Sequence, residues 1–319
     1  MRVQLDYEVE LPQPQAAARL WLPLPLDAAH QELLAVEHRG NCRRAGVFRQ
    51  AAAGGRALYL EWSGEAAPRL HAVVTARVRE RNFLPPRAAE PAPPPEAVCA
   101  FLLPSPMVPT DGAVRQLAAE ITRGKHGAWE KAQAAYDWVV DHTRRDDAVK
   151  ACGLGDVRTM LADGKLSGKC VDIGSLFVAL ARAAGVPARE VFGMRVAPSR
   201  LAPSLGKSGD VSTAQHCKTE FYASGCGWVP ADPADVRKAM LEENLTLQEE
   251  RTHKLREALF GHADPDWLGF NHAREVNLTP LQDGPALNYF MYPYGEVDGV
   301  PRDAWDPERF RYRITARPL

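Results

Sequence analysis

The stretch that decides the fold is GKCVDIGSLFVALARAAGVPAR, residues 168–189. Its apolar residues after Cys170 recur at helical spacing. One helix face would collect Ile173, Leu176, Phe177, Leu180 and Ala184. Gly185 is a helix stop signal, and Pro187 just beyond it does not continue a helix. The spacing therefore predicts a core helix that begins at Cys170.

A cysteine at the start of a helix has an electrostatic advantage as a nucleophile. The attacking form is the thiolate, and a thiol with the ordinary pKa of about 8.5 is ionised only to a few per cent at neutral pH. The unpaired backbone N–H groups and the positive dipole end of the helix would favour the thiolate of Cys170. The same amides could face an oxyanion, and Gly168 lets the backbone approach closely. Cys170 is therefore the candidate nucleophile.

A second stretch, HCKTEFYASGCGWVPADP at residues 216–233, supplies a base and a carboxylate. We expect a hairpin with strands at 216–222 and 227–229, which would return Asp232 to the side of His216. Histidine is the side chain whose ordinary pKa suits proton transfer near neutrality. A neighbouring carboxylate fixes the imidazole tautomer and stabilises the imidazolium. His216 is the candidate base and Asp232 its orienting partner.

Each of these residues also has an ordinary structural explanation. A cysteine at a helix start is often a small buried side chain, and Asp232 before Pro233 fits a turn. Their order favours a triad: cysteine at a helix start, histidine opening a strand, aspartate at the next strand end. Cys217 would point to the opposite strand face from His216, which predicts a packing role. Cys226 falls in the hairpin turn.

Two motifs resemble those of the transglutaminase-like superfamily. The first, a Gly-x-Cys helix with a Pro-Ala-Arg end, is formed here by Gly168, Cys170, Leu176, Phe177, Leu180, Arg182, Gly185, Pro187, Ala188 and Arg189. The second is formed by His216, Cys217, Glu220, Phe221, Tyr222, Gly227, Trp228, Val229, Pro230 and Asp232. The resemblance is strong over residues 113–235 and implies a Cys170, His216, Asp232 triad.

The resemblance also implies the fold class. We expect an α+β protein, in which a papain-like transglutaminase core of helices packed on an antiparallel sheet follows a small all-β sandwich domain. Lys218 departs from the family pattern, because many members have tryptophan there. We expect a mobile cation beside the site in place of a rigid aromatic wall, which would change substrate preference and leave the triad intact.

The rest of the chain divides by composition. Period-two alternation from Val3 to Leu11, at 57–62 and at 70–78 predicts a β-sandwich over residues 1–83. Residues 84–112 are rich in proline, which predicts a linker. Helical spacing at 113–122 and 129–140 opens a catalytic domain over residues 113–319. The loop at 198–215 could cover the cleft.

Charge and hydropathy exclude several classes of function. Lys and Arg number 39 against 40 Asp and Glu, so no overall field would gather nucleic acid. No run approaches the roughly 18 apolar residues of a membrane span. Met1 leads directly into the first strand pattern, so we expect a cytoplasmic protein as the sequence stands, and a periplasmic one if a leader was removed. We expect all six cysteines to be thiols. The sequence does not indicate the oligomeric state.

The resulting functional prediction is thiol-dependent acyl chemistry on peptide or amide bonds, with a peptide or protein as substrate. Water as acceptor gives a cysteine protease or amidase, which we favour by family expectation. An amine gives a protein-glutamine transglutaminase. The rival class is a non-catalytic module that binds peptides or partners. We expect no cofactor and no metal, because the cysteines and histidines lack zinc-ligand spacing.

Overall fold

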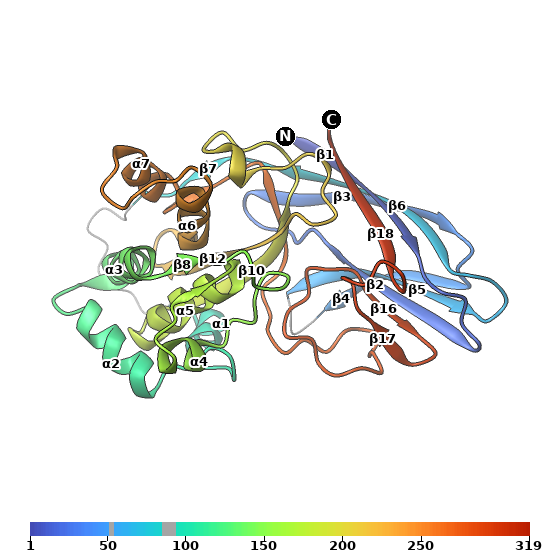
Figure 1. Ribbon diagram of the computed structural model, residues 1–319, viewed down its shortest axis with the longest axis horizontal. Coiled ribbons are helices and arrows are strands. Elements are labelled where there is room, and N and C mark those ends of the chain that lie inside the picture. Colours follow the sequence, from blue (N-terminus) through green and yellow to red (C-terminus); the bar gives the residue numbers. More distant parts are fainter. Residues whose placement is uncertain (51–53, 85–93) are drawn as a thin grey trace.

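The computed structural model describes residues 1–50, 54–84 and 94–319, and shows two regions side by side (Figure 1). Helices gather around a small sheet in one region. The other consists of strands from both ends of the chain, and the two termini lie close together (Figure 1). The fold is therefore mixed helix and antiparallel sheet with a strand-rich N-terminal region, as predicted.

Two five-stranded sheets make up the strand-rich region. The first has the strand order β11 (Gly209–Asp210), β18 (Arg311–Pro318), β1 (Arg2–Glu10), β6 (Arg69–Val78), β3 (Gln31–Gly40). The second has the order β17 (Val300–Arg302), β16 (Tyr294–Val297), β2 (Ala17–Leu24), β5 (Gly55–Ser63), β4 (Arg44–Gln50). Alternation along β1 buries Val3, Leu5, Tyr7 and Val9 in a core shared with β2 and β5, which confirms the period-two pattern.

The C-terminal strands complete both sheets. β18 pairs antiparallel with β1, and β16 pairs antiparallel with β2. Strands within 294–318, which fall inside the expected catalytic domain at 113–319, therefore pair with the N-terminal sheets, and the bounds of that domain stay a prediction. The physical reason is that β1 and β2 each pair with only one strand from the first 83 residues, so each has a free edge that these strands satisfy. The boundary at residue 83 stays a prediction.

The predicted linker contains short helices. Residues 85–93 lie outside the described part of the chain. Beyond them come α1 (Glu96–Cys99) and the 3-10 turn η2 (Ala100–Leu102). The Phe101 ring packs edge-on against Trp228, with centroids 4.9 Å apart. The second half of the linker is thus attached to the helix-rich region.

The helix-rich region, which contains the predicted catalytic residues, is built on the four-stranded sheet β13-β12-β10-β15. Its strands are β10 (Ala188–Arg195), β12 (Gln215–Ala223), β13 (Gly227–Ala231) and β15 (Trp267–Asn271). Its helices are α2 (Gly112–Ile121), α3 (Gly127–His142), α4 (Val157–Ala162), α5 (Cys170–Ala183), α6 (Pro233–Glu242) and α7 (Glu250–Ala258). Smaller elements are β7 (Arg81–Asn82) with β14 (His262–Ala263), β8 (Arg144–Arg145) with β9 (Ser167–Gly168), and η3 (Pro203–Leu205).

Helix α5 is the buried centre of this region. It begins at Cys170 as predicted and packs on β12 and β10. Gly174 faces β12, and a Cβ there would lie 3.0 Å from the Thr219 side chain, so a small residue allows the close approach. Gly185 follows the helix with φ +81°, the left-handed conformation that glycine adopts readily. No helix in the described part of the chain is long and apolar enough to cross a membrane.

Candidate active site

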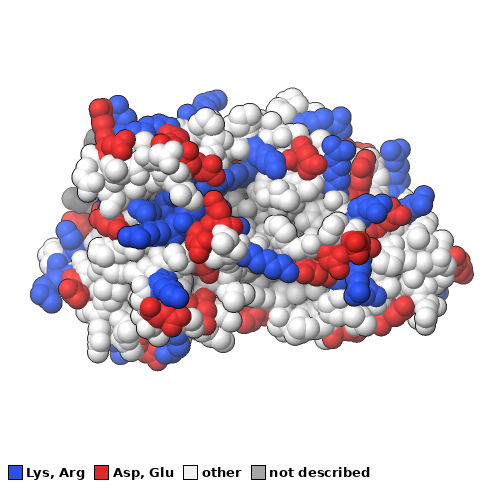
Figure 2. All heavy atoms as spheres, in the orientation of Figure 1, with Lys and Arg blue, Asp and Glu red and all other residues white. Residues whose placement is uncertain are grey.

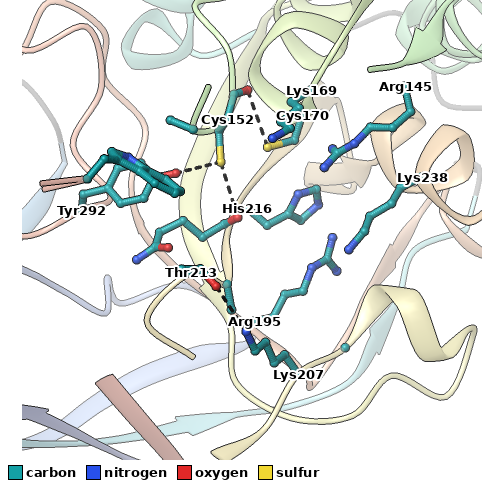
Figure 3. A pocket seen from close by; sticks show the side chains of 15 residues that line it. Arg145, Cys152, Lys169, Cys170, Arg195, Lys207, Thr213, His216, Lys238 and Tyr292 are labelled. Atoms are coloured by element: carbon teal, nitrogen blue, oxygen red, sulfur yellow. Dashed lines mark hydrogen bonds between the residues drawn. The ribbon is translucent and has the colours of Figure 1, made fainter. Parts of the chain in front are cut away.

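Three elements bring the predicted residues together. Cys170 is the first residue of α5, His216 is the second residue of β12, and Asp232 directly follows β13. The His216 Nε2 atom lies 2.8 Å from Asp232 Oδ2. All three residues are buried, each only 3% exposed. Figure 3 shows the His216 ring beside the Cys170 thiol.

Asp232 uses its two carboxylate oxygens for different partners. Oδ2 meets His216, while Oδ1 accepts a hydrogen bond of 3.0 Å from the backbone N–H of Asp235. The second bond makes Asp232 the N-cap of α6, with Pro233 at the first helical position. The turn explanation therefore applies to this residue, and the same carboxylate also contacts the imidazole. The cap holds the carboxylate in place against the imidazole.

A second carboxylate, Asp235, faces the same histidine. Its Oδ1 lies 3.3 Å from His216 Nε2, and its two oxygens receive both terminal nitrogens of Arg195 at 2.5 and 3.1 Å. Sequence reasoning missed Asp235 and Arg195. The Asp-Pro-Ala-Asp pattern at 232–235 is a helix start that places both aspartates on one turn, so it was a usable signal for Asp235. Nothing local connects Arg195 with a residue 40 positions away.

These charges set the protonation states. The Asp235 and Asp232 carboxylates raise the pKa of His216 to about 10, against the lowering effects of burial and Arg195. Hydrogen bonding from the Cys152 thiol, followed by hydrogen bonding and charge from His216, holds the pKa of Cys170 well below its usual value despite burial. At neutral pH the site therefore favours a thiolate and imidazolium pair.

A second thiol lies beside the first. Cys152 Sγ is 3.1 Å from the Tyr292 hydroxyl, and the Cys152 carbonyl accepts from the Val171 N–H at 2.9 Å. The pKa of Cys152 is raised well above its usual value by its hydrogen bond with Cys170 and by burial. Cys152 therefore stays a thiol, and its S–H has the Gln215 backbone carbonyl as an acceptor at 3.5 Å. No motif or residue spacing pointed to Cys152 or Tyr292.

Asp172 attaches the loop that carries Cys152 to the start of α5. Its Oδ1 accepts the backbone N–H groups of Leu154 and Gly155 at 3.0 and 2.8 Å, and its Oδ2 accepts that of Lys169 at 2.9 Å. A Cβ at Gly153 would lie 1.9 Å from the same carboxylate, so the loop needs glycine there. This support fixes Cys152 against Cys170.

Lys218 is held in place, which corrects the expectation of a mobile cation. Its side chain is 7% exposed, with Nζ 2.5 Å from Asp264 Oδ2 and 3.8 Å from Asp232 Oδ2. Both carboxylates raise its pKa despite burial. The physical reason is that a buried ammonium must be paired to remain charged. The Lys218 side chain also lies 5.6 Å from the centre of the Trp267 ring, so an aromatic wall is present from another strand.

The remaining cysteines and arginines have structural surroundings. All six cysteines are free thiols. Cys217 is buried, in keeping with the predicted packing role, and Cys226 is partly exposed. Arg189 pairs with Glu220 at 2.7 Å and stacks over the Trp228 ring at 3.9 Å.

A cavity of about 350 Å³ opens beside the Cys170 thiol and the His216 ring. The loop at 198–215 contributes part of its wall, so this loop borders the cleft. The full lining is Arg145, Ala151, Cys152, Lys169, Cys170, Arg195, Gly206, Lys207, Thr213, Ala214, Gln215, His216, Lys238, Tyr292 and Trp305.

One group of side chains has the composition of a metal site. His216, Asp232 and Asp235 place ligand atoms within 4.8 Å of one another. Arg195 and Lys218 already bring positive charge against these carboxylates. A metal cation would meet repulsion from both, so the donor set fits an ion-paired base better than a metal centre.

Comparison with known proteins identifies the same region. Residues 115–233 match the family described as the transglutaminase-like superfamily. An uncharacterised protein of Haemophilus influenzae is 35% identical over 331 residues, spanning 98% of this chain and 90% of that protein.

Two solved structures match this chain over most of its length. The first, a candidate cysteine protease from Cytophaga hutchinsonii, matches with a TM-score of 0.55 and 14% identity over 99% of this chain and 98% of that one. The periplasmic domain of TgpA from Pseudomonas aeruginosa matches with a TM-score of 0.38 and 16% identity over 78% of this chain and 92% of that one.

Proposed function

Because the chain belongs to the transglutaminase-like superfamily, we propose that it hydrolyses a peptide or amide bond through an acyl-enzyme on Cys170. His216 is the general base and acid, and Asp232 orients it. The observation that carries the proposal is the meeting of Cys170 and His216 at one cavity, with His216 Nε2 2.8 Å from Asp232 Oδ2. The lowered pKa of the thiol and the raised pKa of the imidazole support it. Such opposed shifts in a cleft are characteristic of activated nucleophiles.

The chemical steps follow from that charge state. The Cys170 thiolate attacks the amide carbonyl carbon, a C–S bond forms, and the negative charge moves to the carbonyl oxygen. The His216 imidazolium gives its proton to the amine nitrogen as the C–N bond breaks. Water then attacks the thioester and loses a proton to His216, and the C–S bond breaks to restore the thiolate. The products are a carboxylic acid and an amine.

Asp232 and Asp235 have separate parts in this cycle. Asp232 accepts from Nε2 of the histidine, which leaves Nδ1 for the exchange with sulfur and substrate. Asp235 adds a second negative charge beside the imidazolium, and Arg195 fixes that carboxylate from the other side. Both aspartates act through His216, so they are positioning residues.

The test is a substrate screen with peptide and glutamine-amide libraries, with and without added amine, read by mass spectrometry. Cys170→Ala is expected to lower turnover at least about 10³-fold, while the thermal midpoint changes little because only a sulfur atom is lost. Cys226→Ala, at the hairpin turn, serves as the matched control. Full activity in the Cys170 variant would show that another residue is the nucleophile.

Alkylation separates the enzyme from a binding module. Iodoacetamide near neutral pH is expected to modify Cys170 first, and His216→Ala is expected to slow that reaction because the thiolate loses its imidazolium partner. Modification of Cys170 no faster than that of the other thiols would favour the non-catalytic alternative. Amine incorporation in place of hydrolysis would identify a transglutaminase on the same triad.

A further inference from the structure

The cavity beside Cys170 is lined by positive charge. Arg145, Lys169, Arg195, Lys207 and Lys238 all border it, and no aspartate or glutamate is among the residues that line it. Figure 3 shows Arg145, Arg195 and Lys238 projecting toward the space beside His216. The whole chain has a net charge of −1, so this charge is a local feature of the cleft.

Two of these cations are already neutralised within the protein. Arg195 pairs with Asp235, and Arg145 Nε lies 2.8 Å from Asp147 Oδ1. The three lysines differ: no ion pair joins Lys169, Lys207 or Lys238 to a carboxylate in the described part of the chain. Their charge is therefore free to act on a ligand.

The hydrogen bonds of two lysines show how they are held. Lys238 Nζ donates to the Ser204 carbonyl at 2.6 Å, and Lys207 Nζ lies 3.2 Å from the Thr213 hydroxyl. Burial, followed by the nearby Arg195 charge, lowers the pKa of Lys238. A partly buried ammonium without a carboxylate is electrostatically unfavourable in the free protein. An anion in the cavity would relieve that cost.

The same cavity contains a polar side chain with no partner. Gln215 is 8% exposed and lines the cavity, and neither its Oε1 nor its Nε2 has a hydrogen-bond partner among the residues that the structure describes. Buried amide groups are normally hydrogen-bonded, so this one is available to a bound molecule. An amide side chain can bond both the carbonyl and the N–H of a peptide unit.

The face drawn in Figure 2 has a matching charge distribution around elements that border this cavity. Figure 2 shows lysine and arginine side chains gathered around α6 and β8, the elements that carry Lys238 and Arg145. Acidic side chains lie beside this group and not in the cavity lining. A negatively charged substrate would be drawn to the cleft, while other parts of the face in Figure 2 carry both signs of charge.

We infer that the cleft selects an acidic substrate, a peptide or amide with a carboxylate close to the bond that is cleaved. Lys238 and Lys207 bind the carboxylate, and Gln215 bonds the adjoining peptide unit. This inference rests on the proposed function, because it names the substrate class of the same site. The carboxylate could be a Glu or Asp side chain or the terminal carboxylate of a peptide.

The experiment compares matched peptides on the full chain. Pairs differ by Glu or Gln at each position flanking the cleaved bond, and each is made with a free and an amidated C-terminus to separate the two carboxylate sources. The kcat/KM ratio of the acidic to the neutral member is expected to be at least about tenfold, the scale of one charge-assisted contact. A ratio near one for every pair would overturn the inference.

Variants assign the preference to the lysines. Lys238→Met with Lys207→Met is expected to reduce the ratio to within about threefold. Lys254→Met is the matched control, because Lys254 on α7 is exposed and paired with Glu250 away from the cavity. Its ratio is expected to equal that of the unmodified chain. A double variant that retains the full ratio would also overturn the inference.

A binding measurement keeps this result separate from the chemistry. Calorimetric titration of Cys170→Ala with the same peptides reports the preference without turnover. Tighter binding of acidic peptides together with no hydrolysis by the unmodified chain would contradict the proposed function and support the charge preference. Hydrolysis by the unmodified chain with equal binding of acidic and neutral peptides would support the proposed function and contradict the charge preference.

Discussion

The two regions of this protein keep their charges in different places. In the sandwich, β1 alternates buried apolar residues with polar ones outside, and ion pairs such as Arg77 with Glu32 lie at the surface. In the catalytic region, Arg195, His216, Asp232 and Asp235 are all at most 6% exposed and pair with one another. The sandwich interior is held mainly by apolar burial, with Glu296 on β16 as one buried carboxylate that pairs with Arg19. The other interior contains a network of buried ion pairs.

This difference in buried charge indicates what stabilises each region and what its interior must do. Apolar contacts are non-directional, so the sandwich needs only the correct pattern and volume. Buried ions are costly unless every partner is present, and they seldom add net stability over apolar packing. The catalytic region accepts that cost at the site where the histidine must stay charged. Its stability therefore depends on single partners far more than that of the sandwich does.

The largest expected effect comes from removing one buried partner. Asp235→Asn leaves the Arg195 guanidinium buried without a carboxylate, and the free energy of unfolding is expected to fall by about 3–5 kcal/mol. The measurement is urea denaturation followed by circular dichroism. Glu32→Gln is the control, because the exposed pair with Arg77 is expected to contribute less than about 1 kcal/mol. Equal losses of unfolding free energy in the two variants would show that buried and exposed ion pairs contribute alike, which would contradict the contrast between the regions.

A smaller effect is expected from the apolar side of the comparison. Leu5→Ala leaves a cavity at a fully buried position of β1 and is expected to lower the free energy of unfolding by about 3 kcal/mol. Activity per folded molecule is expected to stay unchanged, because β1 does not border the cleft. Glu8→Ala, at an exposed position of the same strand, is expected to stay within about 0.5 kcal/mol of the parent. A loss of kcat in Leu5→Ala would mean that the two regions are coupled.

The same contrast explains which parts of the fold and of the site could be predicted from the sequence. Alternation from Val3 to Val9 and helical spacing after Cys170 are local patterns, and both elements formed as predicted. The pairing of β18 with β1 was missed because it joins residues about 310 positions apart. The apolar pattern of a strand does not indicate which other strand it pairs with. Arg195 with Asp235 was missed for the same reason, since ion pairs across 40 residues leave no periodic signal.

Lys218 shows a different limit. Its position in the motif was read correctly, but its mobility was not, because the residues that bury and pair it, Asp264 and Trp267, come from a later part of the chain. A sequence motif predicts the order of the residues and the face of the strand on which each side chain lies. It does not predict which later segment of the chain packs over that face.

The smallest expected effect concerns the pH dependence of activity, which tests whether the buried charges of the catalytic region set the protonation of Cys170 and His216. The pKa of Cys170 is lowered and that of His216 is raised to about 10, so the ion pair exists between those two values. Below the lower value the thiolate gains a proton, and above the upper value the imidazolium loses the proton that the leaving amine needs. The profile of kcat/KM is therefore expected to be flat through neutral pH and to fall near pH 10, with both limbs belonging to the coupled pair.

Asp232→Asn tests the origin of the alkaline limb. The substitution removes one of the two carboxylates that face the imidazole, so the pKa of His216 falls and the alkaline limb moves to lower pH. Asp235 and its Arg195 partner remain in this variant, so the histidine keeps one buried anion. An alkaline limb that already lies near pH 7 in the unmodified chain would mean that the buried carboxylates do not hold the proton on His216. In that case the buried ion pairs of the catalytic region would not serve to keep His216 protonated, and the functional contrast with the sandwich would be lost.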